Sequence, residues 1–227
     1  MSRNHDLAQR MAELARAVAA PRSMDDVLGD VTATALQLIP GADASGVLLL
    51  GKGGAFESLG DTSELPGKLD ELQVRYQEGP CVQAAVDDLI VRTEDFRKEE
   101  RWPRYSKGAV ELGVLSGVSF KLYTGDRTAG ALNLFSFTSN AFDGEAETIG
   151  SVLAAHAAAA ILSSRQSEQL QSALTTRDRI GQAKGIIMER YGVDDLRAFE
   201  MLRQLSQDSN TRLTDVAQRV IDTRTSG

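Results

Sequence analysis

The side chains of residues 177–227 suit hydrogen bonding to an anionic partner better than they suit catalysis. Lys184, Arg203 and Arg212 offer cations, and Gln207 and Asn210 add short polar groups. Donors of these types can meet the phosphates and splayed bases of a nucleic acid. The same cations could instead be the solvated face of a purely structural helical bundle. The residues by themselves leave both interpretations open.

Cysteine and histidine offer little further chemistry. Cys81 is the one cysteine of the chain, which excludes an internal disulfide and a multi-cysteine zinc site. It follows Pro80 at an expected helix N-terminus, which could lower its pKa and make it an oxidant sensor, although we favour a buried structural cysteine. His156 is interpreted as a packed residue rather than a haem ligand. Without a nucleophile–base pair or a phosphate-binding glycine loop, the sequence predicts no catalytic residue, metal site or cofactor.

The charge of the chain argues against strong nucleic-acid binding. Its 25 Lys and Arg against 32 Asp and Glu give a formal charge of −7. Residues 177–227 contain nine Lys or Arg and eight Asp or Glu, which gives +1 and leaves −8 for residues 1–176. Because non-specific phosphate binding needs clustered positive charge, a single C-terminal module is expected to bind weakly and through shape.

The elements expected to position these residues begin with an α+β region. An apolar stripe predicts a helix within residues 1–22, and Ser23 caps a second helix that runs to about residue 38. Alternating and Val-rich segments predict strands at 44–50, 55–59, 89–92, 114–123 and 128–137, with helices at 63–76 and 101–112 between them. The pattern predicts an antiparallel sheet with flanking helices.

From residue 144 onward the pattern is helical only. A seam from Ile149 to Leu174 has spacings that alternate between four and three, as in a coiled coil, and predicts a helix of roughly 30 residues that needs a partner. Three shorter helices follow as an all-α bundle. The second of them carries Leu196, Phe199, Leu202 and Leu205 as its apolar residues.

The bundle segment resembles the ANTAR family. The resemblance runs from Arg177 through the first helix to Arg190, and continues in order through Ala198-Phe199, Leu202-Arg203 and Val216-Ala217. It implies a three-helix module that binds a pair of short RNA hairpin loops in nascent transcripts and so favours antitermination. The RNA-binding residues that it implies are Arg177, Gln182, Lys184, Gly185, Arg203, Ser206, Gln207, Asn210 and Arg212.

Residues from about 23 to 164 are similar to GAF domains. The resemblance rests on the order of the elements and on Glu78-Gly79-Pro80-Cys81, Arg101-Trp102 and Gly130-Ala131-Leu132-Asn133-Leu134. It implies a GAF-type antiparallel sheet with flanking helices, an unidentified small-molecule ligand, and dimerisation through those helices. Some GAF relatives reduce methionine sulfoxide with two or more cysteines, which this chain does not contain.

The sequence therefore predicts an N-terminal helix at 1–22, a GAF sensor domain at 23–164, a helical linker at 165–176 and an ANTAR domain at 177–227. We expect a homodimeric, non-enzymatic antiterminator that binds dual-hairpin leader RNA under control of the sensor. A ligand-binding dimer that acts through protein partners, or a small-molecule redox enzyme, are the alternatives. No apolar run reaches the roughly 20 residues of a membrane span and no signal peptide is visible, so we expect a cytoplasmic protein without membrane contact.

Overall fold

The computed structural model describes residues 23–50, 56–81, 89–124 and 127–225. The chain divides into two compact units, with the boundary between Ser164 and Arg165. The expected N-terminal helix of residues 1–22 lies outside the described residues.

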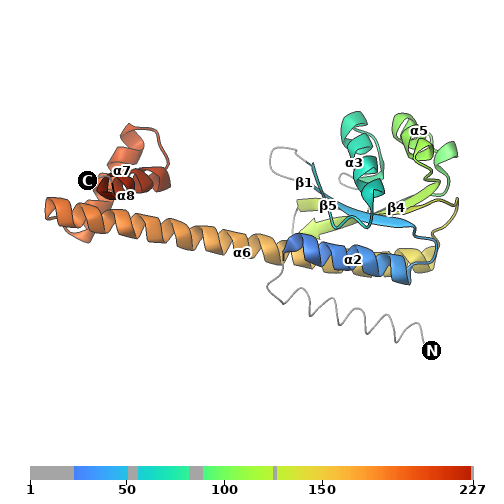
Figure 1. The fold of residues 1–227 in the computed structure, drawn as a ribbon, viewed down its shortest axis with the longest axis horizontal. Coiled ribbons are helices and arrows are strands. Elements are labelled where there is room, and N and C mark those ends of the chain that lie inside the picture. The colour runs from blue at the N-terminus through green and yellow to red at the C-terminus, as the bar shows by residue number, and fades with distance from the viewer. Residues whose placement is uncertain (1–22, 51–55, 82–88, 125–126, 226–227) are drawn as a thin grey trace, which may run out of the picture. The chain divides into compact units, whose positions relative to one another are not determined.

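A five-stranded antiparallel sheet forms the centre of the first unit (Figure 1). Its strand order is β2-β1-β5-β4-β3, and every neighbouring pair is antiparallel. The strands are β1 (Ala44–Leu50), β2 (Phe56–Leu59), β3 (Ile90–Thr93), β4 (Ser116–Thr124) and β5 (Arg127–Ser136). The α+β fold expected from the sequence is confirmed.

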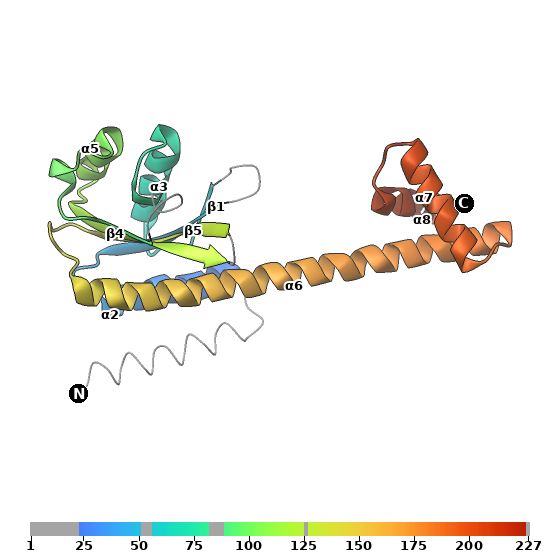
Figure 2. The same ribbon diagram turned by 180° about the vertical axis from the view of Figure 1, so that it is seen from behind.

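Helices cover both faces of this sheet (Figures 1 and 2). One face packs on α2 (Met24–Leu38) and on the first part of α6 (Gly144–Tyr191), and the other lies under α3 (Glu64–Tyr76) and α5 (Pro103–Glu111). A short 3₁₀ helix, η2 (Phe96–Lys98), precedes α5. Because side chains alternate along a strand, Leu132 and Leu134 of β5 join the core with α2 and α6, whereas Phe135 joins the core with α3 and α5.

Local signals in the sequence explain where the helices begin and end. The Ser23 hydroxyl accepts a hydrogen bond from the Asp26 N–H at 3.1 Å and caps α2, as expected. Gly150 allows α6 to lie close to the sheet, because a Cβ at this position would meet the Phe120 ring. Gly192 ends α6 with a φ of 63°, a left-handed conformation that glycine adopts without strain.

The long helix differs from the expectation. A helix of roughly 30 residues followed by a separate first bundle helix was expected, but α6 is one helix of 48 residues. The segment between Gly150 and Gly181 contains neither proline nor glycine, so nothing in it interrupts the backbone hydrogen bonds. The helix that closes the sensor core is therefore also the first helix of the bundle.

The second unit packs the end of α6 against α7 (Asp195–Asp208) and α8 (Leu213–Thr225). Its buried residues are Ala183, Ile187, Ala198, Leu202, Val216 and Ala217. The expected apolar face of α7 is wrong in part, because Leu196 and Leu205 are 69% and 51% exposed and Phe199 is only half-buried. The small residue Ala198 and Leu202 one turn later form the core face instead, which leaves Phe199 outside the core.

Among the described residues, one helix, α6, is long and apolar enough by length and composition alone to be a membrane-span candidate. The central helix of a folded domain passes the same test. Ile149, Leu153 and Ile161 of α6 are buried in the core against the sheet. Their burial accounts for the apolar composition of this part of α6.

Candidate nucleic-acid interface and buried polar cluster

A hollow of about 660 Å³ lies between the end of α6 and α7. Arg177, Gln182 and Lys184, three of the residues expected to contact RNA, line it. Phe199 of α7 and Gly181 of α6 line it as well. We call this feature the α6–α7 hollow. The helical repeat explains the grouping, because positions 177, 181 and 184 lie on one face of α6.

Lys184 is held inside the second unit. Its ammonium lies 2.5 Å from Asp195 Oδ1 at the start of α7, and 6.0 Å from the centre of the Phe199 ring. The side chain is 21% exposed. Lys184 therefore joins α6 to α7, and part of its charge is already neutralised by Asp195.

A second face of α7 carries further candidate residues. Positions 199, 203 and 207 follow each other at spacings of four, beside the face that Ala198 and Leu202 bury, and Ser206 lies at the border of that face. Arg203 and Gln207 are exposed there. Ser206 is half-buried, and its hydroxyl donates a hydrogen bond to the Thr211 carbonyl at 2.6 Å. The structure thus gives Ser206 a role in the turn that follows α7.

The remaining candidate residues lie apart from the α6–α7 hollow. Asn210 has a φ of 48°, a left-handed conformation that asparagine tolerates, and its N–H bonds to the Gln207 carbonyl. Arg212 is exposed, and its carbonyl accepts the N–H groups of Asp215 and Val216 at the start of α8. Asn210 and Arg212 therefore shape the turn between α7 and α8, and neither lines the hollow.

Gly185 is exposed on α6, and a Cβ built on it meets no atom within 4 Å. The same holds for Gly181, which was not among the residues expected to contact RNA. Phe199 was not among them either, because the sequence pattern assigned its ring to the core. A signal for both residues was present, since Gly181 and Lys184 share one helical face and Phe199 lies a turn before Arg203.

The first unit contains a cluster of buried polar side chains between the sheet and α3. Asp70 of α3 is 3% exposed and accepts hydrogen bonds from Ser58 Oγ at 2.7 Å and Gln73 Nε2 at 3.1 Å. Asn133 of β5 donates to the same carboxyl at 3.5 Å and accepts from Ser119 Oγ of β4 at 2.7 Å. Burial raises the pKa of Asp70 to about 7. The hydroxyl of Tyr105 on α5 is also buried, without a hydrogen-bond partner among the described residues.

Cys81 lies at the edge of this cluster and is 2% exposed. Its N–H donates to Gln73 Oε1 at 2.8 Å. Burial, with the nearby Asp70 carboxylate as a second cause, raises the pKa of the Cys81 thiol. The helix expected to begin near Cys81 continues into residues 82–88, which lie outside the described residues. The lowered pKa that was considered for this cysteine is wrong, because burial removes water from around the thiolate. The structure supports a buried structural cysteine.

The Cys81 thiol is expected to react more than about tenfold more slowly with a thiol reagent in the native protein than in the urea-unfolded protein. The reason is that burial suppresses both the thiolate and the access of the reagent. Absorbance during modification by a disulfide reagent at constant pH measures both rates. Equal rates in the two states would show that the thiol is open to solvent and restore the oxidant-sensor interpretation.

In the part of the chain that the structure describes, histidine and metal chemistry add no further site. His156 of α6 is half-buried, and its Nδ1 lies 2.9 Å from the Val152 carbonyl. Within the described ranges, no three or more His, Cys, Asp and Glu side chains gather closely enough to hold a metal ion.

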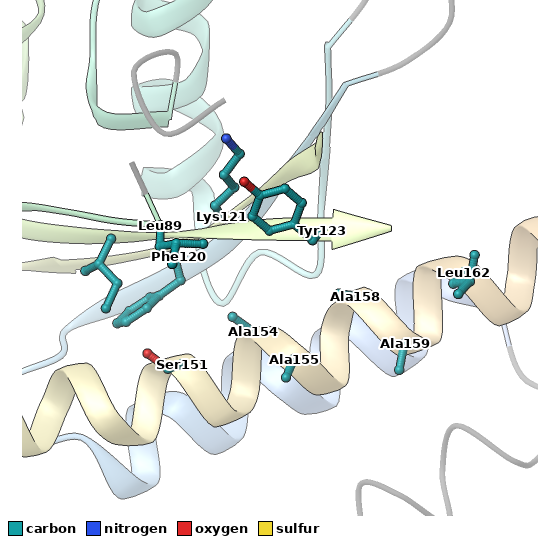
Figure 3. A pocket seen from close by; sticks show the side chains of 11 residues that line it. Leu89, Phe120, Lys121, Tyr123, Ser151, Ala154, Ala155, Ala158, Ala159 and Leu162 are labelled. Atoms are coloured by element: carbon teal, nitrogen blue, oxygen red, sulfur yellow. The ribbon is translucent and has the colours of Figure 1, made fainter. Parts of the chain in front are cut away.

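A second hollow, of about 430 Å³, lies in the first unit between β4 and α6. Figure 3 shows Phe120 directed from β4 toward α6, where Ser151 and Ala154 lie beside it and Ala158 lies farther along the helix. Leu162 lines the same hollow and is 41% exposed. This hollow is mainly apolar, in contrast to the polar cluster on the other face of the sheet.

One helix joins a helix-covered sheet to a small helical bundle, and comparison with known families identifies both parts. The model of the GAF domain matches residues 21–162, and the model of the ANTAR domain matches residues 168–221. The chain belongs to the GAF domain family and carries a C-terminal ANTAR domain.

Solved structures support the GAF fold of the first unit. The GAF domain of a phosphoenolpyruvate-protein phosphotransferase from Coxiella burnetii has a TM-score of 0.57 and 19% identity, over 72% of this chain and 96% of that chain. Free methionine-R-sulfoxide reductase from Neisseria meningitidis has a TM-score of 0.53 and 16% identity, over 71% and 91%. At such identities the likeness shows the fold alone. No curated protein sequence matches the chain.

Proposed function

We propose that this protein is a signal-responsive transcription antiterminator that binds dual-hairpin leader RNA as a homodimer. In this proposal the ANTAR domain contacts the loops, and the GAF domain controls it after binding a small molecule. The matches to both domains support the regulatory part of the proposal. RNA recognition, dimerisation and control are the steps that need experiments.

The observation that carries the proposal is the grouping of cations around a half-buried aromatic ring. Arg177 and Lys184 line the hollow beside Phe199, and Arg203 lies one helical turn beyond Phe199 on α7. RNA loops offer phosphates to cations and unpaired bases to aromatic rings. Because Asp195 already pairs with Lys184, the local charge is small, and one ANTAR domain should bind weakly.

Linking two modules in a dimer can raise the overall affinity for an RNA that carries two loops. When one module is bound to the first loop, the second module meets the second loop at a high effective concentration. The proposed dimer contact is the seam of α6, where Leu170 and Leu174 are 67% and 55% exposed. Their spacing of four is the one that places two leucines on the same helical stripe.

Leu170→Glu is expected to weaken dimerisation, and Leu170→Glu with Leu174→Glu should weaken it by about 100-fold or more. Burying one leucine contributes about 1.5–3 kcal/mol, and a dimer buries each of these leucines twice. Sedimentation equilibrium measures the change. Ser172→Glu is the matched control, since position 172 lies on the opposite side of α6 from position 170. Wild-type association by the double variant would rule out this seam as the dimer contact.

The test of RNA binding is an electrophoretic titration of the full chain at low salt. Its RNA probes carry two hairpins, one hairpin, or two hairpins with closed loops. The proposal requires tightest binding to the two-hairpin RNA and a loss when either loop is removed. Equal affinity for all three probes, or no complex with any of them, would contradict it.

The buried polar cluster is the proposed region of signal reception in the GAF domain. Asp70, Gln73 and Asn133 are polar groups held over the sheet, and Tyr105 adds a buried hydroxyl without a partner among the described residues. A small polar ligand could use these groups. The redox-enzyme alternative needs Cys81, which is buried and is the one cysteine of the chain. Full cellular activity of Cys81→Ser would remove that alternative.

A further inference from the structure

The α6–α7 hollow suggests a finer contact that rests on the proposed RNA binding. We propose that this hollow receives one unpaired nucleobase of each RNA loop, stacked against Phe199. The hollow measures about 660 Å³, within the usual range of about 300–1,000 Å³ for sites that take small organic groups.

The first argument is that Phe199 has no place in the bundle core. The core of the second unit uses Ala198 and Leu202 from α7, and Phe199 is not among its members. The ring is half-buried and lines the hollow instead. Large aromatic rings are usually buried in a core, whereas partly exposed rings beside cations are the usual stacking platforms for single-stranded bases.

The second argument concerns two glycines, Gly181 and Gly185, in the C-terminal part of α6. Glycine inside a helix costs about 1 kcal/mol relative to alanine. A Cβ added to Gly181 or Gly185 would meet no atom within 4 Å, so packing inside the protein does not explain either glycine. Both are exposed and one helical turn apart. Gly181 lines the hollow, and its small size leaves room there for a group that approaches from outside, whereas Gly185 lies outside the lining.

The third argument is the polar rim of the hollow. Arg177 and Gln182 line it with hydrogen-bond donors, and Asp178 adds an acceptor. The edges of nucleobases present both donors and acceptors, and their faces are apolar. A rim of mixed polar groups around a ring therefore matches a base better than it matches a phosphate or an aliphatic side chain. In this arrangement the cations of Lys184 and Arg203 would contact the phosphates next to the stacked base.

Two substitutions of Phe199 and one of Gly181 test the proposal. Phe199→Leu removes the stacking face and keeps an apolar side chain, whereas Phe199→Trp keeps the stacking face. Since stacking contributes about 1–3 kcal/mol per base and the dimer would stack two bases, Phe199→Leu should weaken binding of the dual-hairpin RNA by about 30-fold or more. Gly181→Leu fills the hollow and improves helix propensity, so it should raise the melting temperature and still weaken RNA binding.

The decisive measurement is a double-mutant cycle, in which RNA affinity is compared for substitutions in the protein, in the RNA, and in both. Abasic substitutions are placed one at a time in the loops of the dual-hairpin RNA. At one loop position, the abasic change should weaken binding by the wild-type protein but cause no further loss in Phe199→Leu. Leu205→Ala, an exposed residue of the same helix outside the hollow, is the control and should bind as the wild type does.

The outcomes separate this proposal from the proposed function. If the wild-type chain binds no dual-hairpin RNA, RNA recognition itself is wrong. If the wild type binds but Gly181→Leu and Phe199→Leu bind equally well, the base site is wrong and RNA recognition stands. A third outcome is that Gly181→Leu weakens dimerisation, but the fraction that is still dimeric binds RNA as tightly as the wild type does. In that case a second copy of the chain occupies the hollow, and the base site is again wrong.

Discussion

Replacing Arg177 and Arg203 by glutamate is expected to reduce the affinity for dual-hairpin RNA by about 100-fold or more. Both side chains are exposed, and each lies on the proposed RNA-binding face. In the dimer, the double variant turns four attractive charges into four repulsive ones. The dependence of binding on salt should fall too, by a slope of about 1 for each phosphate that the protein no longer neutralises. Titrations at several salt concentrations measure both effects.

Charge reversal elsewhere provides the control for this experiment. Arg190→Glu with Arg219→Glu makes the same change in net charge at two other exposed positions. Position 190 lies on the opposite side of α6 from Arg177 and Lys184. The control should lose much less affinity, because long-range repulsion is screened within about 10 Å at ordinary salt. Equal losses in both double variants would mean that no particular face of the ANTAR domain binds RNA.

Lys184 needs a milder change than charge reversal. A glutamate at this position would face Asp195 and Phe199, so lost RNA binding could reflect a damaged bundle. Lys184→Gln removes the charge with less disturbance. If it lowers RNA affinity and leaves the melting temperature nearly unchanged, the cation acts on RNA. If both fall together, its main role is to join α6 to α7.

Asp70→Asn is expected to stabilise the folded protein above pH 7 by an amount on the order of 4 kcal/mol. Burial raises the pKa of Asp70 from 3.8 to about 7 in the folded state. A shift of one pKa unit corresponds to about 1.4 kcal/mol, and three units give the expected size. Asparagine keeps the shape of the side chain and carries no charge, so it avoids the cost of ionising a buried carboxyl.

The sign follows from proton binding. The folded state holds the Asp70 proton more tightly than the unfolded state does. The stabilisation that this tighter binding gives is therefore complete below pH 3.8 and is lost as the pH rises toward 7. Above pH 7 the cost of the buried, ionised carboxylate no longer changes with pH. Asp61, whose pKa is also raised by burial, changes stability in the same direction. Urea unfolding at pH 5, 6, 7 and 8 should therefore show the gain of Asp70→Asn growing with pH.

Glu71→Gln is the control for the pH experiment, because Glu71 is an exposed carboxylate on the same helix. It should not reproduce the stabilisation. A gain from Asp70→Asn that is the same at every pH would contradict a neutral buried carboxyl. It would indicate that asparagine merely makes better hydrogen bonds to Ser58 and Gln73.

Much of the fold could be read from local patterns. Ser23 caps α2 where the sequence placed it, and the alternation in β5 sends Leu132 and Phe135 to opposite faces. These features depend on neighbouring residues only. The long helix was harder, because the pattern around residues 165–180 fits either a linker or a continuous helix. The structure has one helix through this segment.

By itself the sequence determined the two-domain organisation, the antiparallel sheet, the helical bundle and the group of polar candidates on α6 and α7. Only the tertiary structure decided which of those candidates share a surface. It brought Arg177 and Lys184 beside Phe199, tied Ser206 and Asn210 to a turn, and buried Cys81 and Asp70. Helical spacing defines one face of one helix, but burial and hydrogen bonding depend on the neighbouring element. Helical spacing could relate Gly181 to Lys184 and Phe199 to Arg203, but only the packing of α7 on α6 brought Phe199 and Gly181 to the same hollow.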